Sequence, residues 1–582
     1  MPHPKSAAPL IQTDPRILAA YAEGAGIYRI VPAGVATPSS LADLRDLIEW
    51  AGEHRIGLTA RGAGSGIPGS AVGSGVIVDL RERMPRRLEL NPGARSAVTS
   101  ANITQVELTR AASQHGLRLP PDPSSSGWAT LGGMVATNAA GPRTVRFGPV
   151  RPWVEALELV TADGEVGWLA RGSARSIHPV LDAPVRPDRP DRLEDGPDGR
   201  DGRRSGNAPL AALRRLHQDA LPAIEAARST VVARFPRTRK NTAGYALDQW
   251  LLSGDDLDLV IGAEGTLGFV TTIQWRLDPI PAARSGLRFA LASLGDLEQA
   301  VRALVSLDPS AVELLDRTFL DLVRGTGGGD AGAGLPASAE AVLLVEFERN
   351  DALAARGVAG DAVRALKHIA LDVATALTPA EEQRLWGLRH AASPILAGLP
   401  PDRRSMQIIE DGCVPLSRLG EYVAAVRNAA RRQDLTVVVF GHAGDGNVHV
   451  NVLPELARSD WPERIEALYR EVSEAAIRLG GTVSGEHGDG RLRAPLLEQL
   501  YGAEIMGLFH RVKTAFDPLG IFNPGVKLDL GGSPLQQLKM GPAAAPIPDD
   551  IARALGEIER TGGYARSRME IAREAPGVRR EL

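Results

Sequence analysis

Three glycine-rich segments in the first half of the chain constrain its fold more than any other feature. The first, RGAGSGIPGSAVGSG, follows the predicted strand IGLTAR and leads into another, VIVDL. Residues 64–69 satisfy G-x-G-x-x-G, but a dinucleotide-binding fingerprint needs these glycines to open a helix inside a βαβ unit. Pro68 and the strand that follows argue against such a unit. The bare backbone from Arg61 to Gly69 either presents amide N–H groups to a diphosphate or forms a flexible surface turn.

The second and third segments favour ligand binding. PPDPSSSGWATLGGMVATNAAGPRTVRFG is rich in small and hydroxyl side chains, and GAEGTLGFVT is again glycine-rich between predicted strands. A backbone with so few side chains suits a large planar ligand packed directly against the main chain. Three such loops joined by strands predict one extended cofactor lying across a domain.

Length and composition narrow the class of protein. The 582 residues suggest two to four domains. The chain has 66 Lys and Arg against 70 Asp and Glu, so its charge gives no global case for nucleic-acid binding. No apolar run approaches a membrane helix, and the N-terminus lacks the apolar region of a signal peptide. Cys413 is the only cysteine, which excludes a disulfide framework or an iron–sulfur cluster held by this chain alone; we read it as a small core residue. We expect a cytoplasmic protein, with peripheral membrane contact left open.

Periodicity predicts mixed helices and strands. Helices are expected at PSSLADLRDLIEWAGEHR, capped by Ser39 or Ser40, and at ITQVELTRAASQHG, with a hairpin at WVEALELVTADGEVGWL. DLDLVIGAEGTLGFVTTIQWRLDPIP is read as strand, loop and strand. After about residue 282 a second α+β region begins, with strands at AVLLVEFE and LTVVVFG.

Two charged stretches cannot bury a core. Residues 171–210 are rich in proline, glycine and charge and predict a disordered insertion. The alternative is that this segment is an arm that binds nucleic acid, but its acidic residues offset the charge of its arginines. Residues past 530 predict a charged tail with one loose helix at DDIARALGEIER.

The second half carries two polar strings with possible chemistry. GHAGDGNVHVN contains His442 and His449, and its glycines favour strand–turn–strand over one helix. Alternation would then put His449 and Asn451 on one face. SGEHGDG adds Glu486 and His487. Two imidazoles and one carboxylate make an open three-ligand set for Zn²⁺ or a similar cation. The alternative is that these histidines lie solvated on loops and bind no metal.

These segments together resemble the vanillyl-alcohol oxidase / p-cresol methylhydroxylase superfamily of FAD-binding oxidoreductases. The resemblance is closest to its D-lactate and D-2-hydroxyacid dehydrogenase branch, which includes glycolate oxidase subunits. RGAGSG is similar to the pyrophosphate loop and TLGGMVATNAAG to the T-x-G-G segment. KNTAGYALD, GAEGTLG, LWGLR, GHAGDGNVHVN, SGEHGDGR and FNPGVK follow in the family's order, over residues 32 to 528.

The resemblance implies an α+β fold with a two-part FAD-binding domain, an antiparallel-sheet cap domain carrying substrate residues, and a C-terminal helical return. The predicted divisions are a lead at 1–31, the FAD-binding domain at 32–280, the cap at 281–500, the return at 501–530 and the tail at 531–582.

Non-covalent FAD is expected, because residues 61–75 contain no histidine that could attach it. The residues expected to hold it are Arg61, Gly62, Ala63, Gly64, Ser65, Gly66, Gly69, Pro121, Thr130, Gly132, Gly133, Thr137, Asn138, Gly141, Glu264, Gly265, Thr266, Gly268 and Asn523.

The resemblance also implies roles in oxidising a D-2-hydroxy acid, with a divalent metal ion beside the flavin. His442, His449 and Glu486 are the expected ligands of Zn²⁺ or Mn²⁺. A cation chelated by the substrate would acidify its hydroxyl group. His487 is the expected general base, and Asn451 orients the substrate.

An arginine is expected to bind the substrate carboxylate. Arg389 in LWGLR is the candidate, because a guanidinium binds a carboxylate bidentately. The alternative is a surface salt bridge on a helix, and Arg491 is a weaker second candidate. Hydroxyglutarate-type members carry a lysine near IIEDGCVP, but residues 407–415 contain none. A monocarboxylate such as D-lactate is therefore favoured, although Arg403 and Arg404 could substitute.

Electrons must leave the flavin to a separate acceptor: a quinone, a cytochrome, an electron-transfer flavoprotein or an iron–sulfur subunit. Two alternatives stay open. One is a non-catalytic flavin subunit of a hydroxyacid oxidase complex. The other is the superfamily's non-redox branch, in which FAD assists alkyl exchange on a phosphate ester.

Overall fold

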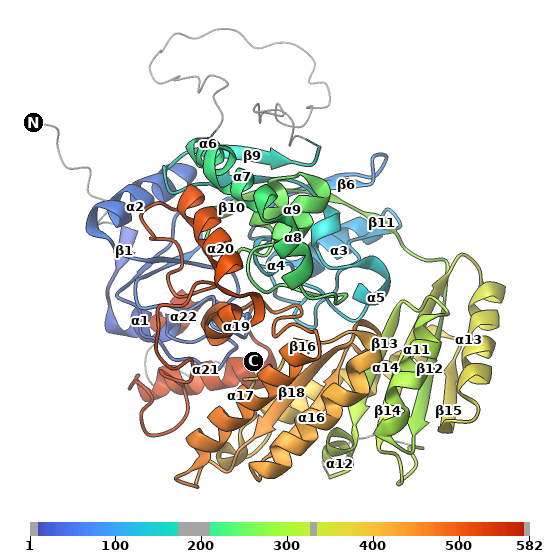
Figure 1. Cartoon of the computed structure of the whole chain (residues 1–582). Helices are drawn as coiled ribbons and strands as arrows, with labels where there is room; N and C mark the ends of the chain where they lie inside the picture. The colour runs from blue at the N-terminus through green and yellow to red at the C-terminus, as the bar shows by residue number, and fades with distance from the viewer. Residues whose placement is uncertain (1–9, 173–209, 326–333, 575–582) are drawn as a thin grey trace, which may run out of the picture.

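The computed structural model describes residues 10–172, 210–325 and 334–574. Its first half contains a small, mainly parallel sheet (Figure 1). In order across the sheet the strands are β1 (Ile11–Gln12), β2 (Gly34–Ala36), β4 (Val76–Asp79) and β3 (Leu58–Arg61). The predicted helix that joins two of them is α2 (Leu41–His54), whose N-cap Ser40 accepts a hydrogen bond from the backbone of Asp43.

A second, antiparallel sheet completes this half of the molecule. Its strands, in order, are β5 (Leu88–Asn91), β6 (Ser96–Ser100), β10 (Phe269–Arg276), β8 (Val154–Val160) and β9 (Val166–Ala170). The predicted hairpin is confirmed as β8 and β9, and the predicted helix before it as α3 (Gln105–Ser113). Strand β10 pairs with both β6 and β8, so the chain following residue 262 is built into the sheet formed by residues 88–170.

Two local predictions were wrong. DLDLV forms the short helix α10 (Leu257–Val260), not a strand, before β10 begins. The second glycine-rich segment is not a loop throughout, because it contains helix α4 (Leu131–Thr137). Thr130 starts that helix by accepting a hydrogen bond from the backbone of Gly133. Capping by a hydroxyl side chain and tertiary packing outweighed the low helix propensity of the two glycines.

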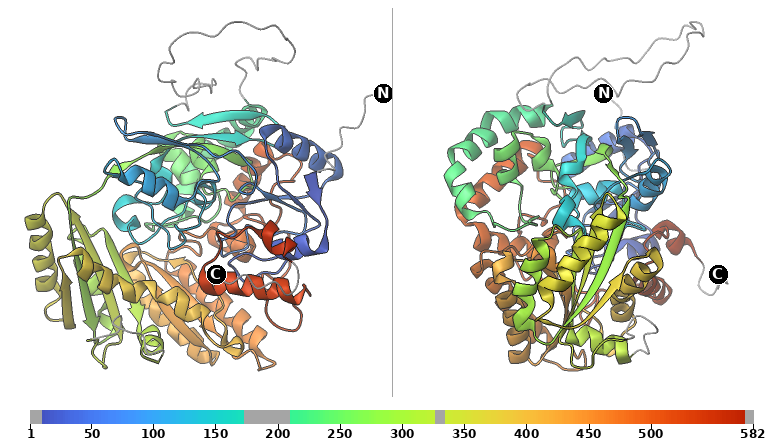
Figure 2. Two further views of the ribbon diagram at one scale, coloured as in Figure 1. Left: turned by 180° about the vertical axis from the view of Figure 1, so that it is seen from behind. Right: turned by 90° about the vertical axis from the view of Figure 1, so that its right-hand side faces the viewer.

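The second half is organised around a seven-stranded antiparallel sheet, as predicted (Figures 1 and 2). In order its strands are β15 (Ala370–Ala376), β12 (Ala283–Leu291), β14 (Ala341–Arg349), β13 (Ala311–Asp316), β17 (Thr436–Gly441), β18 (Asn447–Leu453) and β16 (Gly412–Cys413).

Helices cover both faces of this sheet. One face packs against α11 (Leu297–Val305), α13 (Ala352–Leu366), α16 (Leu419–Arg432) and α17 (Trp461–Arg478). The other packs against α12 (Arg317–Gly325), α14 (Pro379–His390) and α15 (Ala392–Ala397). Because both faces are buried, the central strands are continuously apolar apart from a few acidic residues.

Buried ion pairs join the two halves. Glu346 and Glu348 on β14 are almost fully buried. Arg143 binds both carboxylate oxygens of Glu346, at 2.8 and 2.7 Å, and Arg118 binds Glu348 at 2.6 Å. Both arginines come from the first half of the chain, so the charges that make these glutamates tolerable in the core also fix the halves to each other.

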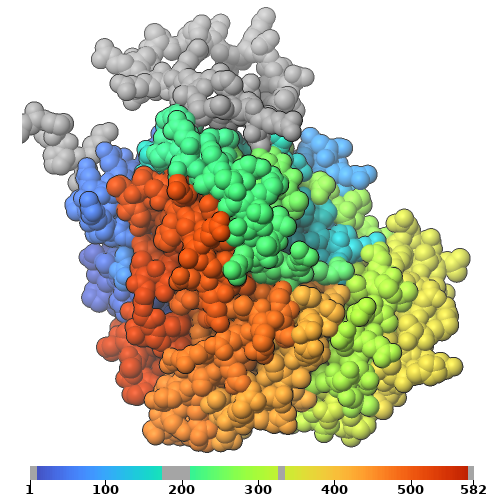
Figure 3. Space-filling model, viewed as in Figure 1, coloured from blue at the N-terminus to red at the C-terminus, as the bar shows by residue number. Residues whose placement is uncertain are grey.

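The C-terminal part returns to the first half. Helix α20 (Ala503–Phe516) packs against α6 (Ala211–Arg215), and in the space-filling view the orange return lies between blue and green surfaces (Figure 3). The prediction of a loose tail was wrong. Helices α21 (Asp549–Thr561) and α22 (Arg568–Arg573) pack against α1 (Pro15–Tyr21). An apolar stripe on α21 is buried there, which its charged composition had masked.

Nearly all of the predicted insertion at 171–210 lies outside the described residues. Within the described part of the chain, no helix combines the length and apolar character needed to cross a membrane.

The packing of α21 predicts a stability difference. Leu555 is 4% exposed, so Leu555→Ala should lower the free energy of unfolding by about 2–5 kcal/mol through lost burial and the cavity left behind. Leu252 on α9 (Leu247–Ser253) is 82% exposed, and Leu252→Ala should change it by no more than about 0.5 kcal/mol. Urea unfolding measures both; equal effects would mean that α21 is not part of the core.

Candidate active site

A large cavity lies where the three glycine-rich segments meet the seven-stranded sheet. It contains about 1810 Å³ of space free of protein atoms, including its open mouth, which is ample for a dinucleotide. The first segment reaches it from the carboxyl end of β3, the usual place for ligands in a parallel sheet. The predicted cofactor residues that line it are Arg61, Gly62, Ala63, Gly64, Ser65, Gly66, Thr130, Gly132, Gly133, Thr137, Gly141, Glu264, Gly265 and Gly268.

The other predicted cofactor residues do not line the cavity; they are Gly69, Pro121, Asn138, Thr266 and Asn523. Some of them hold its wall in place. Asn523 donates hydrogen bonds to the carbonyl oxygens of Ser70 and Glu264, both at 2.8 Å, and so ties the first segment to the third. Asn138 ends α4 in the left-handed region, at φ 49°.

Arg61 also has a supporting role. Its guanidinium donates to the backbone carbonyls of Tyr21, Glu23 and Ala71, at 3.1, 2.7 and 3.3 Å. Because the side chain is buried and binds these three carbonyl groups, it holds the first glycine-rich segment in shape.

The glycines of the wall are required by close approach. A Cβ at Gly62 would lie 2.3 Å from the hydroxyl oxygen of Thr130, and one at Gly132 would lie 2.6 Å from the Cβ of Ala101. Neither contact is sterically possible without movement of the neighbouring chain. The wall is therefore flat main chain, which fits a large planar ligand.

The polar end of the cavity brings the two histidine-containing strings together. GHAGDGNVHVN forms β17, a short turn and β18, so the predicted strand–turn–strand is confirmed. The cavity is lined by His442, His449 and Asn451 from this hairpin and by Glu486 and His487 from the SGEHGDG loop. They include every residue predicted to bind metal or to move protons, together with Asn451, which was predicted to orient the substrate.

His442, His449 and Glu486 form a set that could hold a metal ion. Their ligand atoms lie within 4.8 Å of one another, and all three residues are buried. Oε1 of Glu486 is 2.9 Å from Nε2 of His442 and 3.4 Å from Nε2 of His449. The sequence strings thus converge on one carboxylate oxygen.

The opposite nitrogen of each histidine is anchored. Nδ1 of His442 lies 2.5 Å from Oε1 of Glu313, and Nδ1 of His449 donates to the carbonyl oxygen of Glu410 at 2.7 Å. With Nδ1–H donated, Nε2 of each ring is left to face Glu486. This arrangement is typical of histidines that bind zinc, where a second hydrogen bond fixes the tautomer.

Electrostatics also fit a cation. Burial opposes the ionisation of Glu486, but His442 and Lys240 hold the pKa of its carboxyl well below the usual range. Glu486 Oε1 and His442 Nε2 approach as a hydrogen-bonded pair only if His442 carries a second proton. A divalent cation can replace that proton, because the donor set is then two neutral imidazoles and a carboxylate.

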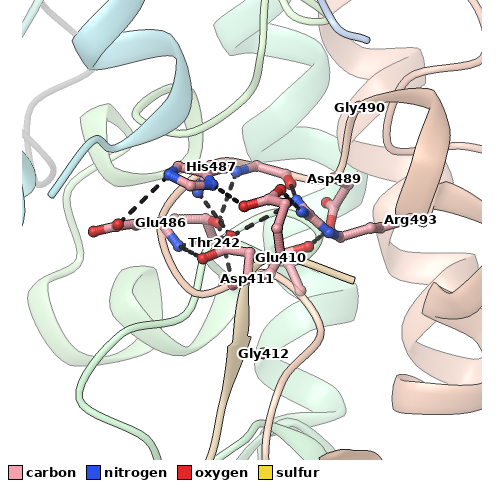
Figure 4. A network of polar contacts seen from close by, with 12 residues as sticks. Thr242, Glu410, Asp411, Gly412, Glu486, His487, Asp489, Gly490 and Arg493 are labelled. Atoms are coloured by element: carbon pink, nitrogen blue, oxygen red, sulfur yellow. Dashed lines mark hydrogen bonds and ion pairs between the residues drawn. The ribbon is translucent and has the colours of Figure 1, made fainter. Parts of the chain in front are cut away.

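His487 is held by the carboxylate of Glu410, which was not predicted from the sequence (Figure 4). Its Nδ1 lies 2.5 Å from Oε2 of Glu410, and its backbone N–H donates to Asp411 at 2.8 Å. Arg493 pairs with the other oxygen of Glu410. Burial lowers the pKa of His487, but Glu410 and Asp411 outweigh burial and raise that pKa to about 9.

Arg389 is buried at the site and is not a surface salt bridge. It lies on α14, is 6% exposed and lines the cavity. Its Nε donates to Oε2 of Glu313 at 2.7 Å, and its guanidinium lies 4.9 Å from the ring centre of Phe440. The other arginines considered do not line the cavity; they are Arg403, Arg404 and Arg491. Arg491 instead binds the backbone carbonyls of Val72 and Pro524.

Several charged residues that support the site were not predicted from the sequence. Glu313, Glu410 and Lys240 are each almost fully buried and contact the predicted site residues. For Glu313 the available signal was an acidic residue inside the apolar strand pattern AVELLD, since charges are rarely buried unless they are paired. Cys413, by contrast, is buried on β16, in agreement with its interpretation as a core residue.

Two family models match the chain. One, described as FAD binding domain, matches residues 32–170, and the other, described as FAD linked oxidases, C-terminal domain, matches residues 280–526. The glycine-walled cavity is therefore that of a flavin-dependent oxidoreductase, with its polar end supplied by the second domain. Together the models span about two thirds of the chain, which belongs to the FAD-linked oxidases.

Characterised relatives are similar over most of their length. The chain is 29% identical over 501 residues to the glycolate oxidase subunit GlcD of Bacillus subtilis, covering 86% of this chain and 89% of that one. It is 28% identical to the D-lactate dehydrogenase of Archaeoglobus fulgidus, covering 84% and 90%. It is 26% identical to the D-2-hydroxyglutarate dehydrogenase of Stutzerimonas stutzeri, covering 85% and 90%.

Solved structures confirm the predicted fold class. p-Cresol methylhydroxylase superposes with a TM-score of 0.59 at 15% identity, covering 90% of this chain and 94% of that one. An alkyldihydroxyacetonephosphate synthase superposes with a TM-score of 0.55 at 14% identity, covering 90% and 83%. At this identity the similarity establishes the fold alone.

The glycine wall gives a test of flavin binding. Gly132→Ala should lose bound flavin and lower the thermal midpoint, because its Cβ would collide with Ala101 and push α4 out of place. Gly127 has open space around its Cβ position, and Gly127→Ala should retain flavin at the wild-type ratio. The ratio of flavin to protein absorbance measures both variants. Full flavin retention by Gly132→Ala would contradict the binding of flavin against this wall.

Proposed function

We propose that this protein is an FAD-dependent dehydrogenase that oxidises a D-2-hydroxy acid, D-lactate or a close analogue, to the 2-oxo acid. The observation that carries the proposal is the convergence of His442, His449, Glu486, His487 and Arg389 at one end of the glycine-walled cavity. Relatives named as D-lactate and D-2-hydroxyglutarate dehydrogenases and as a glycolate oxidase subunit support a hydroxy-acid substrate.

The three glycine-rich segments would hold FAD non-covalently, since residues 61–75 offer no histidine. When bound, FAD would supply the hydride acceptor for the Cα–H of the substrate, and the proton of the substrate hydroxyl would pass to a base of the protein. His442, His449 and Glu486 would hold Zn²⁺ or Mn²⁺ through Nε2, Nε2 and a carboxylate oxygen, and such a cation makes a bound hydroxyl group more acidic.

His487 is the proposed general base. Glu410 accepts from its Nδ1, so Nε2 is the atom that would take the hydroxyl proton, in the manner of other carboxylate–imidazole pairs. Without a cation its pKa of about 9 keeps the ring protonated at neutral pH. A divalent cation held by His442, His449 and Glu486 would oppose that protonation and favour the neutral imidazole that a general base requires.

Arg389 and Asn451 are the proposed substrate-orienting residues. With Nε of Arg389 bound to Glu313, its two terminal nitrogens keep a parallel pair of donors for one carboxylate. Oδ1 of Asn451 accepts from Ser405 at 2.9 Å, which leaves the amide nitrogen to donate to a substrate oxygen. Neither Arg403 nor Arg404 lines the cavity, so a second carboxylate lacks an evident partner among these arginines and a monocarboxylate is favoured.

Electrons would leave the reduced flavin to a separate acceptor, a quinone, cytochrome, electron-transfer flavoprotein or iron–sulfur subunit. The lone cysteine cannot hold an iron–sulfur cluster by itself. A second candidate function is that of a non-catalytic flavin subunit whose partner performs the chemistry, because one relative is named as a subunit of glycolate oxidase.

Anaerobic bleaching of the flavin band near ~450 nm tests the proposal. D-Lactate, L-lactate, D-2-hydroxyglutarate and glycolate are added separately, with and without chelator and restored Zn²⁺ or Mn²⁺. We expect rapid bleaching by a D-monocarboxylate, loss of bleaching with chelator and recovery with metal. In His449→Ala, kcat/KM should fall roughly 100-fold or more, since even outer partners of metal ligands contribute about 10- to 100-fold.

His510→Ala is the matched control, because His510 lies exposed on α20 away from the cavity and should leave turnover unchanged. Full turnover by His449→Ala would refute the metal assignment. A flavin-loaded protein that no hydroxy acid reduces would point to the accessory subunit or to non-redox alkyl exchange.

The role of Arg389 is tested by substrate affinity. Arg389→Gln should raise KM for the hydroxy acid by roughly 10- to 100-fold, because a charge-assisted hydrogen bond to a buried carboxylate contributes about 1.5–3 kcal/mol. Arg403→Gln changes an arginine outside the cavity and should leave KM unchanged. Steady-state kinetics with an artificial electron acceptor measures both. If Arg403→Gln raised KM more than Arg389→Gln, Arg403 and not Arg389 would be the residue that binds the substrate carboxylate.

A further inference from the structure

One buried carboxylate contacts both the proposed substrate arginine and a proposed metal ligand. Glu313 lies on β13, in the middle of the seven-stranded sheet, and is 0% exposed. Strand β13 pairs antiparallel with β17, with Leu314 opposite Gly441, so the same register brings Glu313 opposite His442. Helix α14, which carries Arg389, covers this face of the sheet.

The two oxygens of Glu313 have separate partners. Oε1 lies 2.5 Å from Nδ1 of His442, and Oε2 accepts from Nε of Arg389 at 2.7 Å. The first contact orients the ring so that Nε2 of His442 faces Glu486. The second uses only Nε of Arg389, so its two terminal nitrogens can bind the carboxylate of a substrate. One rigid side chain on a central strand thus orients both groups.

We propose that Glu313 is a positioning residue that sets the spacing between the cation and the carboxylate-binding arginine and thereby selects 2-hydroxy acids over 3-hydroxy acids. The proposal rests on the proposed function. In a 2-hydroxy acid the hydroxyl and carboxylate are on adjacent carbons, whereas a 3-hydroxy acid separates them by one more bond of roughly 1.5 Å. A fixed spacing therefore accepts the first and misplaces the second, and misplacement by about 1 Å is costly in a reacting complex.

Glu346 serves as a structural control for Glu313, because it is equally buried but does not contact the proposed site residues. Glu346 on β14 lies on the same face of the sheet and is also 0% exposed. It is bound by Arg143 and Ser310, outside the polar end of the cavity. Its loss should cost stability as much as the loss of Glu313, but should not reach the cation or the substrate.

The experiment compares Glu313→Gln, Glu313→Asp, Arg389→Gln and Glu346→Gln. In Glu313→Gln the amide nitrogen would face one of the two donors, His442 or Arg389, and could not accept its hydrogen bond. In Glu313→Asp the side chain is one methylene shorter, so the carboxylate would not reach both donors. Zn²⁺ affinity is measured on chelator-treated protein by competition with a chromophoric chelator, and the visible absorption of the Co²⁺-loaded protein reports ligand geometry. Selectivity is the ratio of kcat/KM for D-lactate to that for D-3-hydroxybutyrate.

We expect both Glu313 variants to bind Zn²⁺ about 10- to 100-fold more weakly, to change the Co²⁺ spectrum and to lose at least ~10-fold in selectivity. Arg389→Gln should lose substrate affinity with Zn²⁺ affinity unchanged. Glu346→Gln should lower the unfolding midpoint and leave both readouts at wild-type values. Folded Glu313 variants that keep wild-type Zn²⁺ affinity and selectivity would overturn the proposal.

Glu313→Asp guards against misfolding, because it keeps a negative charge beside His442 and Arg389. The Zn²⁺ measurement separates this inference from the proposed function, since it needs no turnover. A protein whose Zn²⁺ affinity depends on Glu313, but which oxidises no hydroxy acid, refutes the proposed function and the selectivity while supporting the positioning of His442. A wild-type protein that binds no divalent cation overturns both.

Discussion

The site depends on pairing ionised carboxylates that are buried at the end of the cavity. Glu313, Glu410 and Glu486 are each no more than 5% exposed, and each contacts a histidine and a fixed cationic side chain. Breaking one such pair leaves an uncompensated charge, which typically costs about 3–5 kcal/mol. Because the partners come from distant segments of the chain, these pairs determine how the segments meet.

The same principle connects the glycine-rich wall of the cavity to the SGEHGDG loop. Glu264, in the third glycine-rich segment, accepts hydrogen bonds from the backbone N–H groups of Asp489 and Gly490, at 2.7 and 3.0 Å. Lys527, in the C-terminal return, binds Asp489 at 2.9 Å and lies 3.3 Å from Glu264. A shift of the wall would therefore move the loop that carries the proposed base, because these contacts hold the wall and the loop together.

The fold does not decide the reaction. The chain superposes on p-cresol methylhydroxylase and on an alkyldihydroxyacetonephosphate synthase with similar scores, although their names describe different chemistry. A shared fold supplies the cavity and its backbone wall, while the side chains at the polar end determine which substrate reacts. A hydroxy-acid substrate is accordingly supported by the related sequences and by four side chains at the polar end, those of His442, His449, Glu486 and Arg389.

The sequence by itself determined the local structure and the residue types of the site. Strand–turn–strand at residues 436–453 and a helix cap at Ser39 or Ser40 follow from short-range rules, because alternation and capping are written in neighbouring residues. Tertiary structure alone decided which charges meet. Glu313 and Arg389 are 76 residues apart, and Lys240 and Glu486 are 246 apart, so no local pattern could pair them. It also decided that α21 is packed, since an apolar stripe is stable only when a second surface is there to cover it.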